Sequence, residues 1–504
     1  MDSKAIIIMA VSFLMSLRTF KYGLVVDDIQ AYRFSPQDKK CRKCAHADKC
    51  YGQKKFKDVK EQKAFVEERK AFAKVCLDEK YKNWKRDRDI VKRVRRFFYG
   101  AKAFPTISAD RTFSIVIHTT VSMMIYFVFG HDVVSFLAGL LFALNPITSS
   151  VSTWLNGKRF GVNAILAMLM WHFAPWGALL YVCVPFLQIS AVPALLLYLL
   201  TPYWWIALIA PVLLLPAKGF LKKLLKSRES FTPKYSELYI IKPKKIIIVI
   251  KTIGFYFWHC LFPRRVVMYY GFLAEFGMTD EGNKNGYALN WDFFKGIVAI
   301  SLCIAAMVFY PHTIISLGAF WFLIFMLPCC NVRIFIQTVA DRYAYLSLVG
   351  FMLALVGIMA QLDGLGLLGI FFMLGVYITQ NIIFIPTFYS DIVSLANHNV
   401  FFEKGAVISW VIKIAQAVKQ KHFAEAFGHA QTAIKLFPRD KRILMLNALC
   451  FIKSAQWEQA EKYLKRADMF PMITTDDVIV EMSKAMWLMI KNKDTNIEKL
   501  EGRV

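Results

Sequence analysis

A chain of 504 residues of which 57% are hydrophobic and only 20% are charged is too apolar for an ordinary water-soluble protein. Its mean hydropathy of +0.41 indicates a protein with many membrane spans. The formal net charge of +27 fits basic segments beside anionic lipid headgroups. No nucleic-acid-binding motif accompanies this charge, so we expect membrane lipids and no nucleic acid as partners.

The first apolar run, which begins at Ala5, is followed by no small-residue cleavage site, so we expect an uncleaved first span within residues 1–24. Two acids, Asp27 and Asp28, come soon after it. Because hydrocarbon penalises charge, adjacent carboxylates at the mouth of a span are candidates for function. The alternative is that these acids end the span and face water.

Residues 25–110 form a predicted outer loop, in which residues 35–104 carry a net charge of about +13 by direct count. Within it, Ile90, Val94 and Phe97 recur at helical spacing opposite basic residues. That pattern is typical of a helix lying on a membrane surface, whereas a solvated charged helix is the alternative.

The same loop holds Cys41, Cys44, Cys50 and Cys76. The Cys-x-x-Cys spacing of the first two lets their thiolates share a zinc ion, and the other two would complete the four ligands. Two disulfides are the alternative if the loop faces an oxidising compartment. Because a second Cys-x-x-Cys pair is missing, the spacing leaves both interpretations open.

Residues 111–390 are hydrophobic almost throughout, and we assign them to a transmembrane helix bundle. Together with the first span, apolar runs near bilayer length predict about eleven spans. Prolines between 177 and 216 interrupt the least regular pair. The expected runs after the first are 115–129, 133–144, 162–173, 179–197, 204–215, 246–261, 296–309, 314–327, 343–360 and 367–385.

The loop between residues 215 and 246 is rich in lysine, from Lys218 onward, and the positive-inside rule makes it cytoplasmic. Counting spans back from it places Asp27 and Asp28 on the outer side. The charge of the first loop runs against the same rule, which weakens for long translocated segments.

Residues 391–504 have the pattern of a water-soluble helical array. An aromatic residue and two alanines recur after 34 residues, a period that is the signature of tetratricopeptide repeats. The recurring positions are Phe423, Ala426 and Ala433, followed by Trp457, Ala460 and Ala467. We expect about two such repeats and a capping helix, with two unrelated helix pairs as the alternative.

The predicted outer loops carry short motifs in a fixed order. The motifs are Asp27-Asp28, Asn145-Pro146-Ile147, Gly157-Lys158-Arg159, Pro263-Arg264-Arg265, Met268-Tyr269-Tyr270-Gly271, Leu327-Pro328-Cys329-Cys330-Asn331 and Ala340-Asp341-Arg342-Tyr343. Followed by the repeats, this order resembles the transmembrane-and-TPR O-mannosyltransferases and their bacterial relatives, members of the GT-C superfamily of glycosyltransferases. The resemblance covers nearly the whole chain apart from the enlarged first loop.

The resemblance implies an all-α, polytopic helix bundle of GT-C type followed by a short TPR array. It implies transfer of a hexose, such as mannose, from a polyprenyl-phosphate donor to a hydroxyl of a protein or glycan. A carboxylate would act as the general base, and cationic side chains, alone or with a divalent cation, would stabilise the leaving phosphate. The residues concerned are Asp27 and Asp28 for the base, and Lys158, Arg159, Asp341 and Arg342 for the phosphate.

Two positions depart from the family pattern. Ser150 stands where relatives have a glutamate, and Lys158 takes the place of their first arginine, with Arg159 one residue later. The missing acid indicates an altered donor, an altered acceptor or a loss of activity. For the adjacent Asp341 and Arg342, a local ion pair that caps a span is the structural alternative.

The leading hypothesis is therefore an enzyme of a bacterial inner membrane or the endoplasmic reticulum, with its repeats on the outer or lumenal side, where they could bind the acceptor. The main alternative is a non-catalytic membrane scaffold whose repeats bind a partner. A transporter of lipid-linked sugars is the third. Transporters usually place polar residues at mid-span within repeats of topology, and the sequence shows neither clearly.

Overall fold

The structure is a computed structural model. It describes residues 2–21, 107–153, 157–182, 189–208, 245–263, 266–267, 270, 272, 280–331, 339–389, 392–402, 407–438, 440–469 and 477–493. These residues form helices and no strand, which confirms the predicted all-α class. Asp27, Asp28 and the four cysteines of the first loop lie outside the described residues, as does the lysine-rich loop that begins at Lys218.

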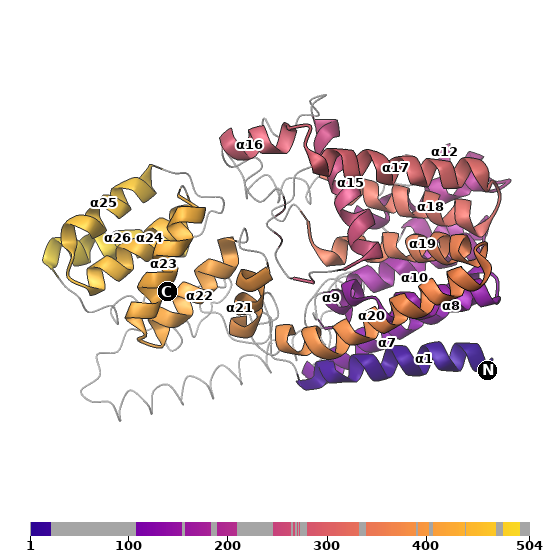
Figure 1. Cartoon of the computed structure of the whole chain (residues 1–504), viewed down its shortest axis with the longest axis horizontal. Helices are drawn as coiled ribbons and strands as arrows, with labels where there is room; N and C mark the ends of the chain where they lie inside the picture. Colours follow the sequence, from indigo (N-terminus) through magenta and orange to yellow (C-terminus); the bar gives the residue numbers. More distant parts are fainter. Residues whose placement is uncertain are drawn as a thin grey trace, which may run out of the picture.

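Apolar helices pack into one bundle, and shorter helices form a C-terminal array beside it (Figure 1). The bundle helices are α1 (Ser3–Ser16), α7 (Ile107–Phe129), α8 (Val133–Leu144), α10 (Lys158–His172), α15 (Lys245–Leu261), α17 (Trp291–Phe309), α18 (Ile314–Met326), α19 (Asp341–Ala360) and α20 (Asp363–Tyr389). Shorter pieces connect them: η1 (Leu17–Lys21), η2 (Pro146–Thr148), α9 (Ser149–Ser152), α12 (Trp205–Leu208), α16 (Asp280–Tyr287) and η8 (Leu327–Cys329).

Helices occur at the positions of the predicted spans, but only some of them have the length of a span. In the described part of the chain, four helices are long and apolar enough to cross a membrane, and a fifth is added if α8 and the bent turn after it count as one. The sequence favoured about eleven spans, and that number stays a prediction. The four or five long helices are consistent with a membrane protein.

The segment from 176 to 200 contains the predicted span 179–197, which belongs to the pair that prolines were expected to interrupt. It forms two 3-10 helices, η4 (Trp176–Val182) and η5 (Ile189–Leu200), and Pro193 lies inside the second. Proline has no N–H to donate, so an α-helical hydrogen bond is lost there. A 3-10 helix rises about 2 Å per residue, so the 12 residues of η5 still extend about 24 Å.

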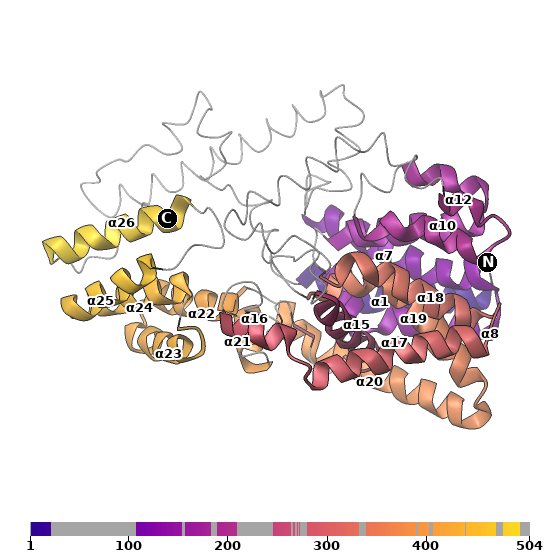
Figure 2. The ribbon, with the colours of Figure 1, turned by 90° about the horizontal axis from the view of Figure 1, so that it is seen from above.

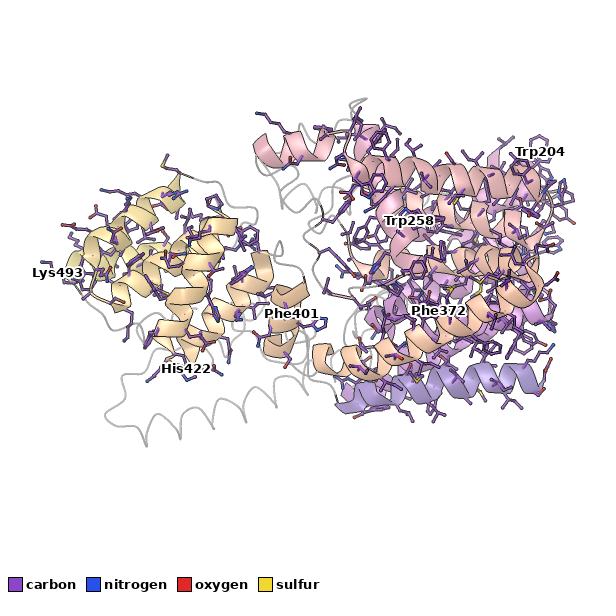
Figure 3. All side chains as sticks on the ribbon, in the orientation of Figure 1. Trp204, Trp258, Phe372, Phe401, His422 and Lys493 are labelled. Atoms are coloured by element: carbon purple, nitrogen blue, oxygen red, sulfur yellow. The ribbon has the colours of Figure 1, made fainter. Side chains whose placement is uncertain are left out.

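Exposed apolar side chains cover the outer helices of the bundle. On α20, Leu368 and Phe372 are 67% and 64% exposed, and on α17, Val308 is 65% exposed. Hydrocarbon is the environment that makes such exposure favourable in a long helix. Trp204, which is 54% exposed, lies at the bundle end remote from the array, as Figure 3 shows. Tryptophan prefers the interface between membrane and water.

Glycines allow the helices of the bundle to touch. Gly318 of α18 and Gly350 of α19 face each other, and a Cβ on either would lie 2.5 Å from the carbonyl oxygen of the other. Between α15 and α17, a Cβ on Gly254 would lie 2.5 Å from the Cα of Gly296, and a Cβ on Gly296 would meet the backbone of Ile250. Apolar side chains gain little by leaving lipid for a protein interior, so close backbone packing is a main source of helix association in membranes.

The C-terminal array begins where α20 ends. Its helices are α21 (Ile392–Phe402), α22 (Val407–Lys419), α23 (Phe423–Leu436), α24 (Lys441–Lys453), α25 (Trp457–Asp468) and α26 (Asp477–Asn492). Figures 1 and 2 both show the array beyond the bundle end at which α20 meets α21. The array has its own core, separate from that of the bundle.

The array repeats at the spacing seen in the sequence. The pair α22–α23 recurs as α24–α25, with each first residue 34 positions later. Lys421 and Ala455, also 34 positions apart, both have left-handed backbone at the turn inside each pair, with φ of 64° and 56°. The four alanines of the predicted repeat, Ala426, Ala433, Ala460 and Ala467, are fully buried.

The glycine contact between α18 and α19 yields the first prediction. Gly350→Ala puts a methyl group into the 2.5 Å contact with the Gly318 carbonyl and should lower the free energy of unfolding by about 1–3 kcal/mol. Gly375→Ala on α20 is the matched control, because its Cβ meets nothing within 4 Å. Thermal unfolding of both variants in detergent measures the difference. Equal stability of the two variants would contradict the packing described here.

Candidate functional site

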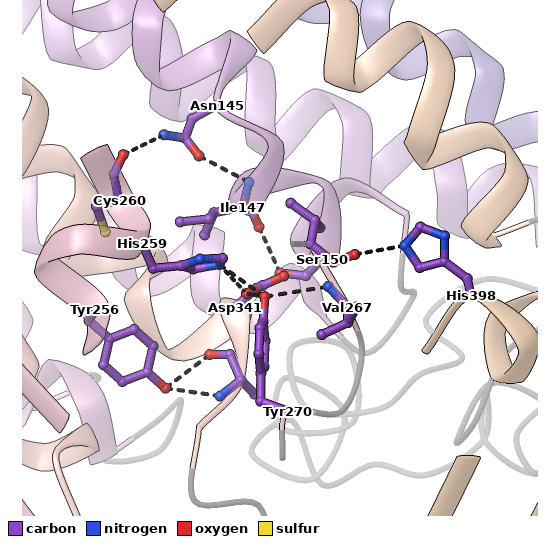
Figure 4. Close-up of polar contacts among 12 residues, drawn as sticks. Asn145, Ile147, Ser150, Tyr256, His259, Cys260, Val267, Tyr270, Asp341 and His398 are labelled. Atoms are coloured by element: carbon purple, nitrogen blue, oxygen red, sulfur yellow. Dashed lines mark hydrogen bonds and ion pairs between the residues drawn. The ribbon is translucent and has the colours of Figure 1, made fainter. Parts of the chain in front are cut away.

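The first residue of α19, Asp341, lies at the centre of a buried polar cluster (Figure 4). Its Oδ1 accepts a hydrogen bond of 2.6 Å from the Tyr270 hydroxyl and lies 3.0 Å from Nε2 of His259. The same Nε2 lies 2.9 Å from the Tyr270 oxygen. Because the tyrosine uses its single proton on the carboxylate, the histidine N–H is the donor to both oxygens.

The environment keeps Tyr270 in its donating form. Burial, and then the negative charge of Asp341, raise the pKa of Tyr270 well above its usual range. The phenol is therefore protonated at neutral pH. The carboxylate of Asp341 also lies in the first turn of α19, where the positive end of the helix dipole stabilises an anion.

Helix α15 positions the start of α19 with two side chains one turn apart. His259 binds Asp341, and the hydroxyl of Tyr256 accepts a hydrogen bond of 2.9 Å from the amide of Ala340. That hydroxyl also donates to the carbonyl of Ala340 at 3.2 Å. Residues three apart on a helix share one face, so one face of α15 makes hydrogen bonds to the start of α19 at two points.

Polar side chains satisfy the helix ends that meet at this site. Asn145 donates to the carbonyl of Cys260 at 3.2 Å, and Tyr377 of α20 donates to the carbonyls of Cys260 and Leu261 at 3.1 and 3.2 Å. Asn381, also on α20, donates to the carbonyl of Leu144 at the end of α8. The last carbonyls of a helix have no partner within it, and in an apolar environment each unpaired one is costly.

Ser150, which occupies the expected glutamate position, lies in α9, and α9 contacts α19, the helix that begins with Asp341 (Figure 4). Its hydroxyl donates a hydrogen bond of 2.9 Å to the carbonyl of Ile147, and its side chain is buried. The side-chain oxygen of Asn145 accepts from the amide of Ile147 at 3.0 Å and so fixes the same turn. The turn therefore presents a neutral hydroxyl where the family pattern has a carboxylate.

Lys158, a predicted phosphate ligand, forms a buried ion pair. Its Nζ lies 2.9 Å from Oδ1 of Asp110, and both side chains are completely buried. A cation in the first turn of a helix is opposed by the helix dipole, and Asp110 offsets this for Lys158 in α10. The charge of Lys158 is thus balanced within the protein.

The two predicted arginines lie on rings that contact each other. Arg159 lies over the ring of Phe160, at 5.4 Å, and Arg342 lies over the ring of Tyr343, at 5.0 Å. The two ring centroids are 6.3 Å apart. The structure therefore brings together the first turns of α10 and α19, which the sequence linked only through a family pattern.

The same end of the bundle receives the end of the first helix. The guanidinium of Arg111, in the first turns of α7, donates to the carbonyl of Thr19 in η1. Asp27 and Asp28 follow this segment in the sequence and lie outside the described residues, as do Cys41, Cys44, Cys50 and Cys76. Within the described part of the chain, no three His, Cys, Asp or Glu side chains gather as metal ligands.

Sequence reasoning missed three residues of the site. His259 and Asp110 were given no role, and Tyr270 was noted only as part of a motif. The sequence contains a weak indication for His259 and Asp110. His259 lies inside a predicted apolar run, and Asp110 lies five residues before one, where titratable residues are candidates for function. Their partners are 82 and 48 residues away, which no local pattern discloses.

Comparison with models of known protein families, with curated proteins and with solved structures finds no match.

The buried pair of Asp110 and Lys158 yields a second prediction. Lys158→Met leaves the Asp110 carboxylate buried without its cation and should lower the free energy of unfolding by about 3–5 kcal/mol. The double variant Asp110→Leu, Lys158→Met removes both charges and should recover most of that loss.

Denaturant unfolding in detergent measures both effects. Lys295→Met is the control, because Lys295 pairs with Asp292 while both side chains are more than 40% exposed. Lys295→Met should lower the free energy of unfolding by less than about 1 kcal/mol. A Lys158→Met protein as stable as the control would show that the pair does not stabilise the bundle.

Proposed function

We propose that the protein is a membrane glycosyltransferase of the GT-C type, which transfers a sugar from a polyprenyl phosphate to an acceptor hydroxyl. The observation that carries the proposal is the meeting of two helix N-termini, each with an arginine, beside the Asp341 cluster. This meeting lies at the bundle end that also receives α1 and the segment leading to Asp27 and Asp28.

The chemistry of a lipid phosphate suits this end of the bundle. Backbone N–H groups and the dipole at a helix N-terminus attract anions, and α10 and α19 both begin here. Arg159 and Arg342 supply charge-assisted hydrogen bonds that strengthen as the phosphate leaves with the electron pair of the broken bond. In this scheme Lys158, balanced by Asp110, fixes the start of α10 and binds no phosphate itself.

Asp341 acts here through position. Its Oδ1 is held by His259 and Tyr270, so the carboxylate anchors the first turn of α19 and thereby the base of the Arg342 side chain. A carboxylate so held has a fixed orientation. The alternative is that a divalent cation, and not arginine, binds the phosphate. In that case Asp341, next to Arg342, is the acid that would bind the cation.

Asp27 or Asp28 is the proposed general base. The acceptor oxygen forms a bond to the anomeric carbon, the bond from that carbon to the phosphate oxygen breaks, and the acceptor proton goes to the carboxylate. Asp27 is six residues beyond Lys21, and an extended chain covers at most about 3.6 Å per residue. The chain from Lys21 to Asp27 can therefore span at most about 22 Å.

The C-terminal array is the proposed acceptor-binding part, built of tetratricopeptide repeats. Its 34-residue spacing and its fully buried alanines support this interpretation. Asn381, about two turns before the end of α20, donates to Leu144 at the end of α8, and Figure 1 shows the array beyond this end of the bundle. We propose that this is the outer or lumenal side of the membrane.

A non-catalytic scaffold is the second candidate. The observation that favours it is Ser150, which has only a hydroxyl where the family pattern has an acid, with that hydroxyl already bonded to Ile147. In that case the array would bind a partner while the bundle transfers nothing.

The third prediction tests the base. Asp27→Asn and Asp28→Asn together should lower the rate of sugar transfer by about 10²–10⁴-fold, because a general base contributes that much. Donor affinity should stay within about threefold of wild type, since the acids contact the acceptor in this scheme. Purified enzyme in nanodiscs with radiolabelled polyprenyl-phosphate mannose or glucose measures both. Full activity of the double variant would remove these acids from the mechanism, and an inactive wild type would favour the scaffold.

The fourth prediction tests the phosphate site. Arg342→Ala should weaken binding of the lipid phosphate by about 10- to 100-fold, the value of a hydrogen bond to a charged group, and should lower transfer as well. Arg442→Ala in the array is the control, because Arg442 pairs with Asp440 far along the chain. Unchanged affinity in Arg342→Ala would place the donor elsewhere.

A further inference from the structure

Helix α21 joins the array to the rest of the molecule. Val400, near its end, is buried in the core of the array together with Trp410 and Ile414 of α22. At its other end, α21 packs against α20 of the bundle. Because α21 contacts both parts, a movement of the array relative to the bundle would move α21 as well.

One side chain of α21 reaches the candidate site. Nε2 of His398 lies 3.2 Å from the carbonyl oxygen of Val266, as Figure 4 shows. Burial lowers the pKa of His398, so its ring is neutral at pH 7, and it binds the carbonyl through an Nε2–H group.

The residue after Val266 continues the connection. The amide of Val267 points to the hydroxyl oxygen of Tyr270 at 3.4 Å, and that hydroxyl donates to Asp341 at 2.6 Å. Both valines are buried. A chain of three hydrogen bonds thus leads from α21 to the first turn of α19.

We infer that His398 is a positioning residue, through which α21 holds the Val266–Val267 backbone so that Tyr270 meets Asp341. Binding of an acceptor to the array would then change how firmly the Val266–Val267 backbone, and with it the contact of Tyr270 with Asp341, is held. This inference rests on the proposed function for its role in catalysis, whereas the mechanical connection stands without it.

The connection has a physical reason. Val266 and Val267 belong to no helix, so their backbone groups depend on side chains for hydrogen bonds. Removing the imidazole leaves the Val266 carbonyl without this donor and lets the segment open more often. Because one neutral hydrogen bond is lost, the opening should become about two- to tenfold more frequent.

Hydrogen–deuterium exchange of the full-length protein in nanodiscs tests the connection. His398→Ala should raise the exchange rate of amides in residues 262–272 by about two- to tenfold. His398→Gln, whose side-chain N–H can reach the same carbonyl, should return the exchange rate to the wild-type value. His429→Ala is the matched control, because His429 also lies on a helix leading into the array core but bonds to Glu425 within the array.

The outcomes separate the two claims. Unchanged exchange in residues 262–272 of His398→Ala, or an increase confined to α22–α26, would overturn the inference. With a working transfer assay, His398→Ala should lower kcat and His398→Gln should recover it. If wild type transfers no sugar, the proposed function fails, and the exchange result still decides whether His398 holds the segment.

Discussion

The buried carboxylate of Asp341 is the constraint on which the rest of the site depends. A charge that is removed from water must find hydrogen bonds and opposite charge within the protein. Asp341 finds them in His259, Tyr270 and the positive end of α19. These contacts join α15 and Tyr270 to the first turn of α19, where Arg342 follows Asp341.

The same requirement explains the polar residues around the site. Several helices begin or end here, and their terminal carbonyls would be unpaired in an apolar bundle. Asn145, Tyr377 and Asn381 satisfy them. At this end the bundle is thus rich in paired polar groups, while Trp204 is exposed at the remote end. The two ends of the bundle therefore differ in polarity, which is consistent with a membrane protein whose two faces differ.

The sequence predicted the local features well and the long-range ones poorly. Hydropathy located the run 133–144 with the bounds of α8, and the period of 34 residues in the array recurs in its helices. Both patterns are properties of neighbouring residues. The prolines between 177 and 216 indicated an irregular segment, and a 3-10 helix contains Pro193, although hydropathy alone does not predict that type of helix.

The candidate site was predicted in part. A family pattern brought Lys158, Arg159, Asp341 and Arg342 together, and the structure has them on adjacent helix starts. The family pattern did not predict that Lys158 pairs with Asp110, nor that His259 binds Asp341. Such pairs depend on which helices pack against each other, and this is decided by contacts such as that of Gly318 with Gly350.

The central claim is that a lipid phosphate binds where α10 and α19 begin. Photo-crosslinking with a polyprenyl phosphate that carries a diazirine beside the phosphate, followed by peptide mass spectrometry, tests it most directly. If the phosphate binds there, we expect labelled peptides around Phe160 and Tyr343, with labelling suppressed by unmodified polyprenyl phosphate. Labelling confined to the remote end of the bundle, around Trp204 and the end of α17, would contradict it.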